Sequence, residues 1–566
     1  MQKSDVTQDT APYYNLGLHR WPLTTSSADC QTWLNRGLLW AYSFNHEESL
    51  RCYERAAACD PSCAMAFWGI AFTSGPNYNK TWKFFDPKDS KASIDKANQN
   101  LARAAELASN ATAVEQGLIR ALAARFPRAY EPDIDFGHLD RMYTEAMRPV
   151  YQANTDYVDA AALFAEALMC ITPRGLWDLD TGEPTGEHTI EARQVIESAF
   201  EPPGGLNHPA LCHLYIHLLE MSPKPEQAQP AADRLRCLVP DASHMLHMPT
   251  HIDAAVGDHR RGVDSNHEAI LADDKYFANE DAPIFYTAYR VHYICAKMYS
   301  AIMSGRFRDA MSAAEKLEKV IDTKVLSITS PPMADFIESF VASRAHVLIR
   351  FGRWEDIIKL ELPEGRDLYS ATTATILYAQ GVAFSALGRV PEAEAAQKQF
   401  EAARARVPAS RLNSIPCKQA DVFGVASAML AGELEYRKGN FDVAFSLLRE
   451  AVRREDALAY SDPPPWMQPV RHALGGLLLE QGRVGEAERV FKEDLGFAAD
   501  FPRRRARPNN VWALHGLHEC LVRSGKADEA LYIQGPLDIA MASADVSITV
   551  SCFCRVNKGD KNGCCT

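Results

Sequence analysis

Apolar residues recur at helical spacing in the segment "HPALCHLYIHLLE", which runs from 208 to 220. At about 100° per residue its leucines and its tyrosine fall on one stripe, while His213, His217 and Glu220 fall on the opposite one. The pattern predicts a helix opened by Pro209, with two imidazoles and a carboxylate on one face. That polar face is either solvated or turned toward a groove.

A second helix is predicted from about Pro249 to Gly257, because proline suits the first helical position and glycine suits a helix end. His247 lies just before this helix and His251 lies in its first turn. The proline fixes the backbone between the two histidines, so their rings are expected not to diverge. Asp253 is predicted to accept a hydrogen bond from one imidazole and so to orient it.

A glycine-centred phrase recurs along the second half of the chain. Glycine takes the left-handed conformation after a helix without steric cost, and the polar residues and alanine that follow open the next helix. The glycines stand 36 to 51 residues apart, which is the range of helical-hairpin repeats with insertions. The phrase occurs as "GRFRDA" at 305–310, "GRWEDI" at 352–357, "GRVPEA" at 388–393, "GNFDVA" at 439–444, "GRVGEA" at 482–487 and "GKADEA" at 525–530, with a weaker copy, "GDHRRG", at 257–262.

The first helical pair matches the tetratricopeptide (TPR) pattern of aromatic, small and terminal proline positions. These positions are Trp33, Gly37, Trp40, Ser49, Tyr53, Ala56 and Pro61. Strand signals are nearly absent, and only "DVSITV" at 545–550 alternates as a strand would. The predicted fold class is all-α: a TPR-like superhelix of helical hairpins, an α-solenoid that its non-repeat parts could close around a central groove.

Three regions follow from the distribution of the repeats. They are an N-terminal TPR hairpin with an aromatic-loop helical region at 1–255, TPR-like repeats at 256–540, and a cysteine-containing tail at 541–566. Between about 75 and 255 the glycine phrase is lost, and the loops "GPNYNKTWKFFDPKD" and "PRGLWDLDTGEPTGEHT" appear. Long aromatic loops of this kind either cover a site or fill space between repeats.

Composition excludes several classes of function. A net charge of −13 argues against nucleic acid as a partner, since phosphate binding needs a basic face. The densest basic run, "RRRAR" at 503–507, is predicted to be a solvated loop. No run of about 18 or more apolar residues occurs, so no membrane span is expected. The polar N-terminus shows no leader core, so the cysteines are expected to be mostly reduced and the compartment cytoplasmic.

Histidine is concentrated in one part of the chain. Eight of the 17 histidines lie between 208 and 267, where an even spread would place about two. Two H-x-x-x-H pairs, His213 with His217 and His247 with His251, can each present two imidazoles to one ion. Two histidines with Glu220 would suit iron or zinc, whereas an all-histidine set would suit copper or zinc. A transition-metal site (Cu, Fe or Zn) is therefore predicted.

Other side chains extend this candidate site. Glu166 and Glu220 are candidate acid or base residues. In the tail, Cys552 and Cys554 are candidate ligands for a soft ion such as Cu(I), or else they fold back over the groove.

Several stretches resemble a family of TPR proteins that is widespread in bacteria and fungi and largely uncharacterised. They are "SFNHEESLRCYERAAACDPSCAMAFWGIAFTSGPNYN", "HLYIHLLEMSPKPEQAQPAADRL", "HMLHMPTHIDAAVGDHRRGVDSNHEAI" and, near the C-terminus, "PPPWMQPVRHALGGLLLEQGRVGEAERVFKEDL". The sequence departs from the family at Cys212, Asp253 and Tyr289, where asparagine, an aromatic residue and histidine are usual. The resemblance covers nearly the whole chain and implies a TPR fold with a shared site, whose histidines correspond to His46, His213, His217, His247, His251 and His292.

No Walker loop, Rossmann fingerprint, G-x-S-x-G elbow or kinase signature is present, so nucleotide chemistry and nucleophilic hydrolysis lack support. We expect a metal-dependent enzyme on a TPR scaffold that activates dioxygen or water against a small molecule. A redox reaction is the first choice, and a metal-dependent hydrolase or lyase is the second. Because the family that the chain resembles occurs in fungi, a role in secondary metabolism is suggested. The alternative is a protein-interaction scaffold whose groove binds a peptide partner and whose histidines are structural.

Overall fold

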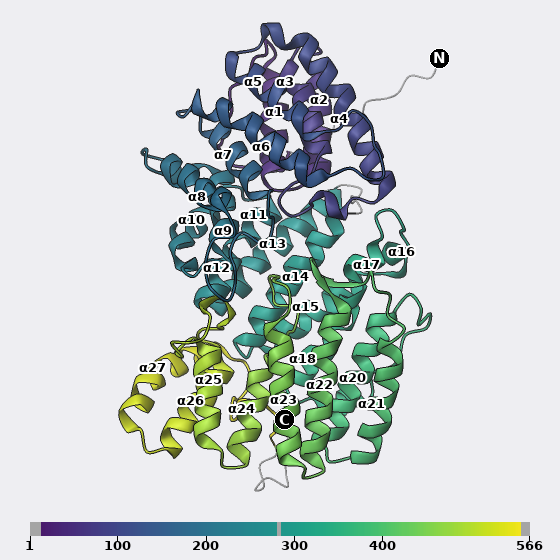
Figure 1. Ribbon diagram of the computed structural model, residues 1–566, viewed down its shortest axis with the longest axis vertical. Coiled ribbons are helices and arrows are strands. Elements are labelled where there is room, and N and C mark those ends of the chain that lie inside the picture. Colours follow the sequence, from purple (N-terminus) through teal and green to yellow (C-terminus); the bar gives the residue numbers. More distant parts are fainter. Residues whose placement is uncertain (1–12, 280–284, 556–566) are drawn as a thin grey trace.

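The structure is a computed structural model of the 566-residue chain, and it describes residues 13–279 and 285–555. Within these ranges the chain is built almost entirely from α-helices, and successive helices pack as hairpins (Figure 1). The all-α, TPR-like superhelix predicted from the sequence is therefore confirmed. Residues 556–566 of the predicted tail lie outside the described residues.

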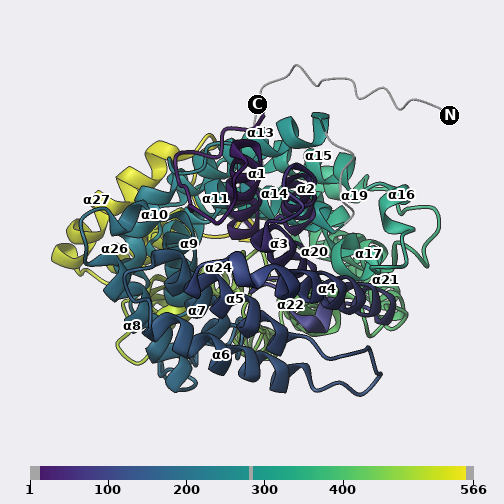
Figure 2. The ribbon, with the colours of Figure 1, turned by 90° about the horizontal axis from the view of Figure 1, so that it is seen from above.

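The N-terminal helices form the upper end of the molecule in Figure 1. In the first repeat Gly69 is required by crowding, because a Cβ there would lie 2.2 Å from the ring of Tyr53. Viewed from above, these helices lie over the middle of the chain (Figure 2), where Arg51 donates to the Tyr276 hydroxyl (2.8 Å). The helices are α1 (Ala28–Tyr42), α2 (His46–Cys59), α3 (Ala64–Ser74), α4 (Pro87–Leu107), α5 (Ala113–Leu122), α6 (Phe136–Gln152), α7 (Val158–Met169) and α8 (Glu187–Phe200).

The middle helices lie at the centre of the molecule, and the C-terminal hairpins form its lower end, with the last of them at the lower left (Figure 1). The middle helices are α9 (Pro209–Leu219), α10 (Gln229–Leu235), α11 (Ser243–His247), α12 (Pro249–Val256), α13 (His259–Asn279), α14 (Tyr286–Met303), α15 (Phe307–Val320), α16 (Thr323–Leu326) and α17 (Met333–Ile337). The C-terminal elements are α18 (Ser343–Arg350), α19 (Trp354–Ile358), α20 (Ser370–Ala386), α21 (Val390–Arg404), β1 (Leu412–Ser414), β2 (Cys417–Lys418), α22 (Gln419–Arg437), α23 (Phe441–Asp456), α24 (Val470–Glu480), α25 (Val484–Leu495), α26 (Val511–Arg523) and α27 (Ala527–Ser543).

The glycine phrase falls at hairpin turns, as predicted. Its glycines, from Gly257 to Gly525, all have φ between +65° and +86°. A Cβ at Gly388 or Gly439 would meet nothing within 4 Å, so the left-handed backbone alone requires glycine at these two turns. The turns join α12 to α13, α14 to α15, α18 to α19, α20 to α21, α22 to α23, α24 to α25, and α26 to α27.

The last hairpin packs back against the middle helices and closes the superhelix. Trp512 of α26 donates from Nε1 to the Ile302 carbonyl of α14 (2.8 Å). Just beyond α27, the carboxylate of Asp545 accepts from the main-chain N–H of Phe307 at the start of α15 (2.6 Å). These contacts join residues that are 210 and 238 positions apart, so the closure that the sequence allowed is present.

The basic run at 503–507 takes part in this closure, and the prediction of a solvated loop is wrong. Arg507 forms ion pairs with Glu455 (2.7 Å) and Asp494 (3.1 Å), and Arg504 donates to the Tyr460 hydroxyl (2.9 Å). The run is only partly exposed because each guanidinium meets an acceptor from a distant segment. Such acceptors leave no local pattern in the sequence.

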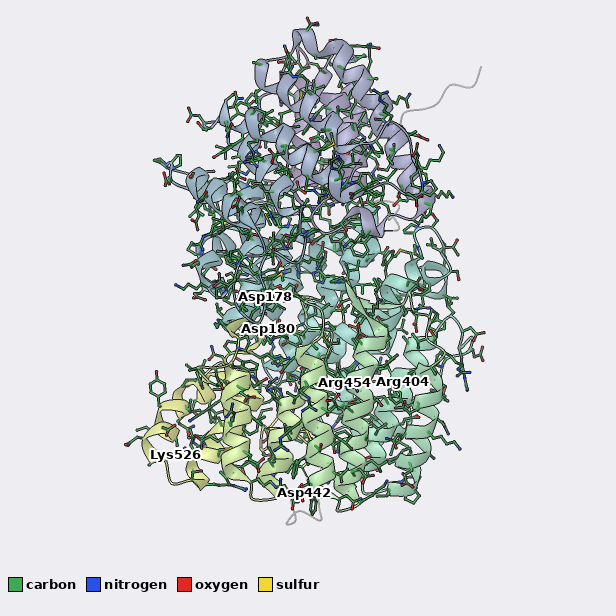
Figure 3. The ribbon with its side chains drawn as sticks, viewed as in Figure 1. Asp178, Asp180, Arg404, Asp442, Arg454 and Lys526 are labelled. Atoms are coloured by element: carbon green, nitrogen blue, oxygen red, sulfur yellow. A yellow bond between two sulfur atoms is a disulfide. The ribbon has the colours of Figure 1, made fainter. Side chains whose placement is uncertain are left out.

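Many other charged side chains lie on the surface. Figure 3 shows Asp178, Asp180, Asp442, Arg454 and Lys526 on the outside of the molecule, and all five side chains are exposed. The carboxylate of Asp180 forms an ion pair with Arg505 of the basic run (2.7 Å). In the described part of the chain, no helix is long and apolar enough to cross a membrane.

The segment 545–550, which alternates as a strand would, is not a strand, and that prediction is also wrong. Ile548 and Val550 are buried and Thr549 is exposed, so the alternation reflects an extended segment that packs without a partner strand. Beyond it, the Ser551 carbonyl accepts from Arg350 of α18 (2.7 Å). The tail therefore lies against α18 and α22, each of which is the first helix of a C-terminal hairpin.

Candidate metal centre

Helix α9 carries the first pair of histidines into the interior. His208 caps this helix by accepting from the Leu211 N–H at its Nδ1 (3.3 Å), and Pro209 occupies the first helical position. Every residue of α9 is buried, including His213 and His217. The polar stripe predicted on this helix is thus turned toward the protein interior and is not solvated.

Helices α11 and α12 carry three more histidines on one face. His244 and His247 lie one turn apart on α11, Pro249 opens α12, and His251 follows one turn after His247. Gly257 ends α12 with a φ of +81°. The predicted helix from Pro249 is therefore confirmed, with one histidine just before it and one in its first turn. All three imidazoles are buried.

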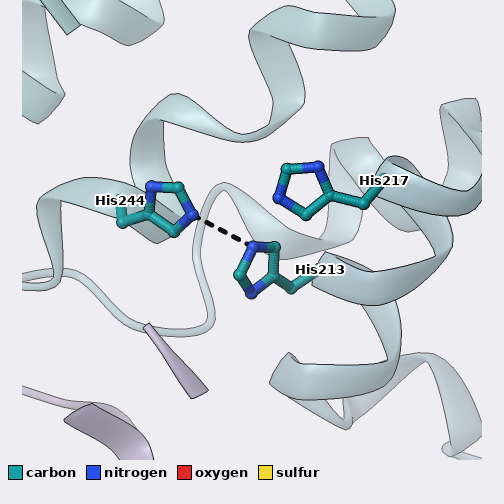
Figure 4. Close-up of side chains that lie close together, drawn as sticks. All are labelled: His213, His217 and His244. Atoms are coloured by element: carbon teal, nitrogen blue, oxygen red, sulfur yellow. Dashed lines mark hydrogen bonds between the residues drawn. The ribbon is translucent and has the colours of Figure 1, made fainter. Parts of the chain in front are cut away.

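Six imidazoles from α9, α11, α12 and α14 form one continuous cluster. Neighbouring ring centroids lie as close as 4.4 Å, for His247 and His292, and 4.8 Å, for His213 and His244. The rings form two groups, and in each group one nitrogen per residue lies within 4.8 Å of the others. We call His213, His217 and His244 the first trio (Figure 4), and His247, His251 and His292 the second trio.

Hydrogen bonds fix the tautomers of two rings of the second trio. The Asn266 amide donates to the Gly262 carbonyl (2.9 Å), so its oxygen faces His247 and accepts from Nδ1 (2.7 Å). The Nδ1 of His251 donates to Glu220 (2.5 Å). Both Nε2 atoms are then bare in the neutral rings, and they face each other 2.9 Å apart. Two facing lone pairs need a positive charge between them, either a proton or a metal ion.

The first trio shows part of the same arrangement: two of its rings are held at Nδ1, whereas the buried Nδ1 of His244 has no hydrogen-bond partner among the described residues. The Nδ1 of His213 donates to the Tyr42 carbonyl (2.8 Å), and the Nδ1 of His217 donates to Glu220 (2.8 Å). The Nε2 of His213 faces the Nε2 of His244 at 3.1 Å (Figure 4). Among the described residues, the buried Nε2 of His217 has no hydrogen-bond partner. One proton can bridge only two nitrogens, so three converging nitrogens fit a metal ion better.

The distances fit this interpretation. Two imidazole nitrogens bonded to one ion at about 2.0–2.1 Å, with an angle of roughly 90–109° between them, lie about 2.9–3.4 Å apart. The His247–His251 and His213–His244 nitrogens are separated by 2.9 and 3.1 Å. Both trios therefore suit a metal ion by donor type, and one pair of nitrogens in each trio has the spacing of two ligands on one ion.

Glu220 connects the two trios, because it accepts a hydrogen bond from the Nδ1 of one imidazole in each. Its two carboxylate oxygens accept from the Nδ1 atoms of His217 and His251, and Tyr460 also donates to it (2.5 Å). Burial alone would raise the pKa of Glu220, but the charge of His251 and the histidine hydrogen bonds outweigh it and hold the pKa well below its usual value. Glu220 therefore stays a carboxylate and orients two imidazoles.

Burial controls the protonation of five of the six imidazoles, and His251 is the exception. Burial outweighs Glu220 and lowers the pKa of His217 to about 4. Burial would also lower the pKa of His251, but the charges of Glu220 and Asp462 outweigh it and raise that pKa. Neutral imidazole is the form that binds a metal ion. Burial, reinforced by neighbouring histidines, likewise holds the pKa well below its usual value for His213, His244, His247 and His292.

Three loops surround the cluster. The Tyr78 ring in the first aromatic loop lies 4.8 Å from the His217 ring, and Trp177 in the second donates to the Leu218 carbonyl (2.7 Å). Between α23 and α24, a third loop brings Asp462 to 3.7 Å from the Nδ1 of His251. The two aromatic loops thus lie beside the candidate site, which is the first of the two roles considered for them.

A pocket lies beside the second trio. His292 and Asp462 form part of its wall, together with aromatic side chains such as Phe285, Tyr289 and Phe336. Small-molecule sites typically have mostly apolar walls with a few polar groups. The pocket therefore has the lining of a site for a small molecule next to the imidazoles.

Other predicted residues lie apart from the trios. The Nδ1 of His46 donates to the Gly75 carbonyl (3.2 Å), and His46 belongs to none of the candidate metal groups. Glu166 is buried beside Arg125 and accepts a hydrogen bond from the main chain at Tyr78. Asp253 is paired with Arg236 (2.6 Å) and does not orient an imidazole, so that prediction is wrong.

Cys552 and Cys554 are joined by a disulfide in the structure. In this oxidised form they offer no thiolate to a soft ion. The prediction of a soft-metal site thus applies only to the reduced pair. The alternative was that these residues fold back over the groove, and the tail does fold back onto the chain, where it contacts α18 and α22.

The side chains at the cluster that were not predicted from the sequence include His244 and Asp462. His244 stands three residues before His247 in the same phrase, so its spacing was a visible signal. Asp462 gave no signal, because it reaches the cluster from a loop far along the chain.

A further group, His19, Asp159 and His208, has suitable atoms for a metal but no bare nitrogen directed at a shared centre. Asp159 accepts from both imidazoles and from Tyr42, and His208 uses its other nitrogen as the cap of α9. This group is a satisfied hydrogen-bond network.

No family model and no curated protein matches the chain. Several solved structures are similar to it at low identity. The Naa15/Naa10 complex bound to HypK-THB is 11% identical, with 90% of this chain and 70% of that chain covered and a TM-score of 0.20. The P58(IPK) TPR domain is 14% identical (82% and 99% covered, TM-score 0.20), and Cut9–Hcn1 of the APC/C is 11% identical (93% and 95%, TM-score 0.24). At such TM-scores the similarity carries no argument, and the fold assignment stands on the hairpins themselves.

Proposed function

We propose that this chain is a metal-dependent enzyme in which each histidine trio holds one transition-metal ion. The observation that carries the proposal is the pair of facing Nε2 atoms of His247 and His251, 2.9 Å apart, whose Nδ1 protons are already committed to Asn266 and Glu220. All-imidazole sets suit copper, zinc and iron, and copper binds most tightly among them. A bound copper ion would supply electron transfer with dioxygen.

The proposed reaction is the oxidation of a small molecule in the adjoining pocket. In the simplest balance, the substrate loses two electrons and two protons, and dioxygen takes them up and leaves as hydrogen peroxide. Asn266, Glu220 and the Tyr42 carbonyl hold the protons of the imidazoles on Nδ1, and the aromatic loops limit access of water. The shared histidines of the bacterial and fungal family that the sequence resembles agree with such a centre, and secondary metabolism is the setting that we propose.

The alternative is a TPR scaffold that binds a peptide partner without catalysis. Its support is the helical-hairpin architecture, which often forms a concave binding surface. Against it, segments of the chain itself contact the first helices of the C-terminal hairpins: Trp466 packs on Tyr378 of α20 (5.6 Å between ring centroids), and Ser551 contacts Arg350 of α18.

A redox test needs no substrate. Tag-free protein is loaded with copper, reduced with ascorbate without oxygen, separated from excess reductant and then exposed to dioxygen. We expect uptake of one dioxygen per two copper ions and the return of the Cu(II) signal in electron paramagnetic resonance. Zinc-loaded protein is the control and should consume none. Copper that binds but does not react with dioxygen would contradict the redox function and favour hydrolase or lyase chemistry, and failure to bind any metal would favour the scaffold.

A further inference from the structure

We infer that the pocket beside the second trio binds a small carboxylic acid with a flat, apolar body, and that Arg174 pairs with its carboxylate. The inference rests on the proposed function, because it names the substrate class of the same site. Arg174 lies in the second aromatic loop and, like His292, forms part of the pocket wall. A molecule held at Arg174 is therefore placed beside the candidate metal centre.

The position of Arg174 is fixed from two sides. Its main-chain N–H donates to the Tyr78 hydroxyl (3.1 Å), and its guanidinium donates to the Asn79 side chain (2.9 Å). Both partners belong to the first aromatic loop. The φ of Arg174 is +58°, a left-handed conformation that residues with a side chain seldom adopt. Unfavourable backbone conformations of this kind are concentrated at functional sites, where surrounding contacts hold them.

The charge of Arg174 is not matched by an ion pair. Among the described residues, no carboxylate oxygen lies within 4.0 Å of its guanidinium nitrogens, and its buried Nε has no hydrogen-bond partner. The one carboxylate among the described residues of the pocket wall, that of Asp462, lies instead 3.7 Å from the Nδ1 of His251. A guanidinium with free donors is the group best suited to bind a carboxylate through two parallel hydrogen bonds.

The pocket wall offers one positive side chain, which favours a ligand with a single negative charge over one with two. Among the described residues that line the pocket, Arg174 is the only arginine or lysine, and Asp462 is the only carboxylate. A phosphate dianion would leave one charge without a partner close to Asp462, which costs free energy at a site partly shielded from water. A carboxylate needs only the one guanidinium.

The rest of the wall suits a flat, apolar body. Phe285 and Phe336 meet edge to face, with ring centroids 5.9 Å apart, and Tyr289 and Phe340 extend the aromatic surface. Aromatic walls of this kind favour a planar ligand, which can stack on one ring and contact the edge of another.

The test uses trans-cinnamate and its neutral amide, cinnamamide, as matched probes. Binding to the metal-loaded full chain is measured by isothermal titration calorimetry for the wild type, Arg174→Gln, Arg174→Lys and the control Arg120→Gln, whose side chain is exposed on the surface. We expect the wild type and Arg120→Gln to bind cinnamate at least tenfold more tightly than the amide. Arg174→Gln should lose this difference, and Arg174→Lys should keep part of it.

Equal binding of acid and amide by the wild type would overturn the inference, and so would a preference that survives in Arg174→Gln. Tighter binding of phenyl phosphate would point to a phosphate site, and tighter binding of a peptide with a free C-terminal phenylalanine would point to a peptide site. The metal content of the same wild-type sample separates the two proposals. If the wild type binds no metal while Arg174 still selects the acid, the enzyme proposal fails and the substrate inference stands.

Discussion

At the scale of single residues, hydrogen bonds to the Nδ1 atoms decide which nitrogen of each imidazole is bare. Asn266 holds His247, and Glu220 holds His217 and His251. Because each Nδ1 proton is committed, the Nε2 lone pairs converge without donors of their own. The partners behind the rings are therefore as important to the proposed centre as the ligands themselves.

Replacement of Asn266 tests this role. Asn266→Leu removes the oxygen that accepts from His247, so the ring can rotate or change tautomer. We expect metal affinity to fall by about 10–100-fold, which is typical when the partner behind a ligand is lost. Asn266→Asp keeps an acceptor in the same place and should retain most of the affinity. Competition with a chromophoric chelator measures both, and equal affinities for the two variants would contradict the proposed role.

Local spacing was enough to identify part of the candidate site. The two H-x-x-x-H pairs were visible because residues four apart share a helix face. His292 entered only through the resemblance, since its helix carries no second histidine at helical spacing. Asp462 and Asn266 could not be found, because a single sequence does not show which distant segments meet.

At the scale of elements, the glycine turns show why the helical hairpins were predictable. A left-handed residue after a helix is a local requirement, so the phrase marks each turn without knowledge of the tertiary structure. The segment at 545–550 and the basic run at 503–507 were misjudged because burial by distant segments decides their conformation. Local signals thus define the elements, and non-local contacts define the exceptions.

Two glycines with open space around the Cβ position make a matched test. Gly388 has a φ of +73°, whereas Gly485 lies in the first turn of α25 without a positive φ. Gly388→Ala should destabilise the protein by about 1–2 kcal/mol, because an L-residue is strained in the left-handed region. Gly485→Ala should be neutral or stabilise it by up to roughly 1 kcal/mol. Urea unfolding followed by circular dichroism measures both, and a loss of stability in both variants would contradict this explanation.

At the scale of the whole molecule, closure of the superhelix brings the candidate site together. The loop with Tyr460 and Asp462 reaches the cluster from between α23 and α24, and Arg504 holds that loop through the Tyr460 hydroxyl. The same closure places the tail against α15, where Asp545 accepts from the main-chain N–H groups of Phe307 and the residue after it (2.6 and 2.9 Å). A residue near the C-terminus therefore caps a helix from the middle of the chain.

Asp545→Ala should remove this cap and destabilise the protein by about 1 kcal/mol, the usual cost of losing a helix N-cap. Asp545→Asn keeps one acceptor oxygen and should cost less. Asp538→Ala, on the exposed side of α27, is the control and should have little effect. The midpoint of urea unfolding compares the three, and an Asp545→Ala midpoint equal to that of the control would show that the distant cap adds nothing.

The metal content of tag-free protein, after loading with copper and removal of weakly bound ions, tests the central proposal most directly. The two trios predict about two ions per chain for the wild type and for the surface control His138→Ala. His247→Ala/His251→Ala and His213→Ala/His217→Ala should each retain about one ion, provided that circular dichroism shows an intact helical fold. A wild type that binds no metal, or variants that bind as much as the wild type, would contradict the proposed centre.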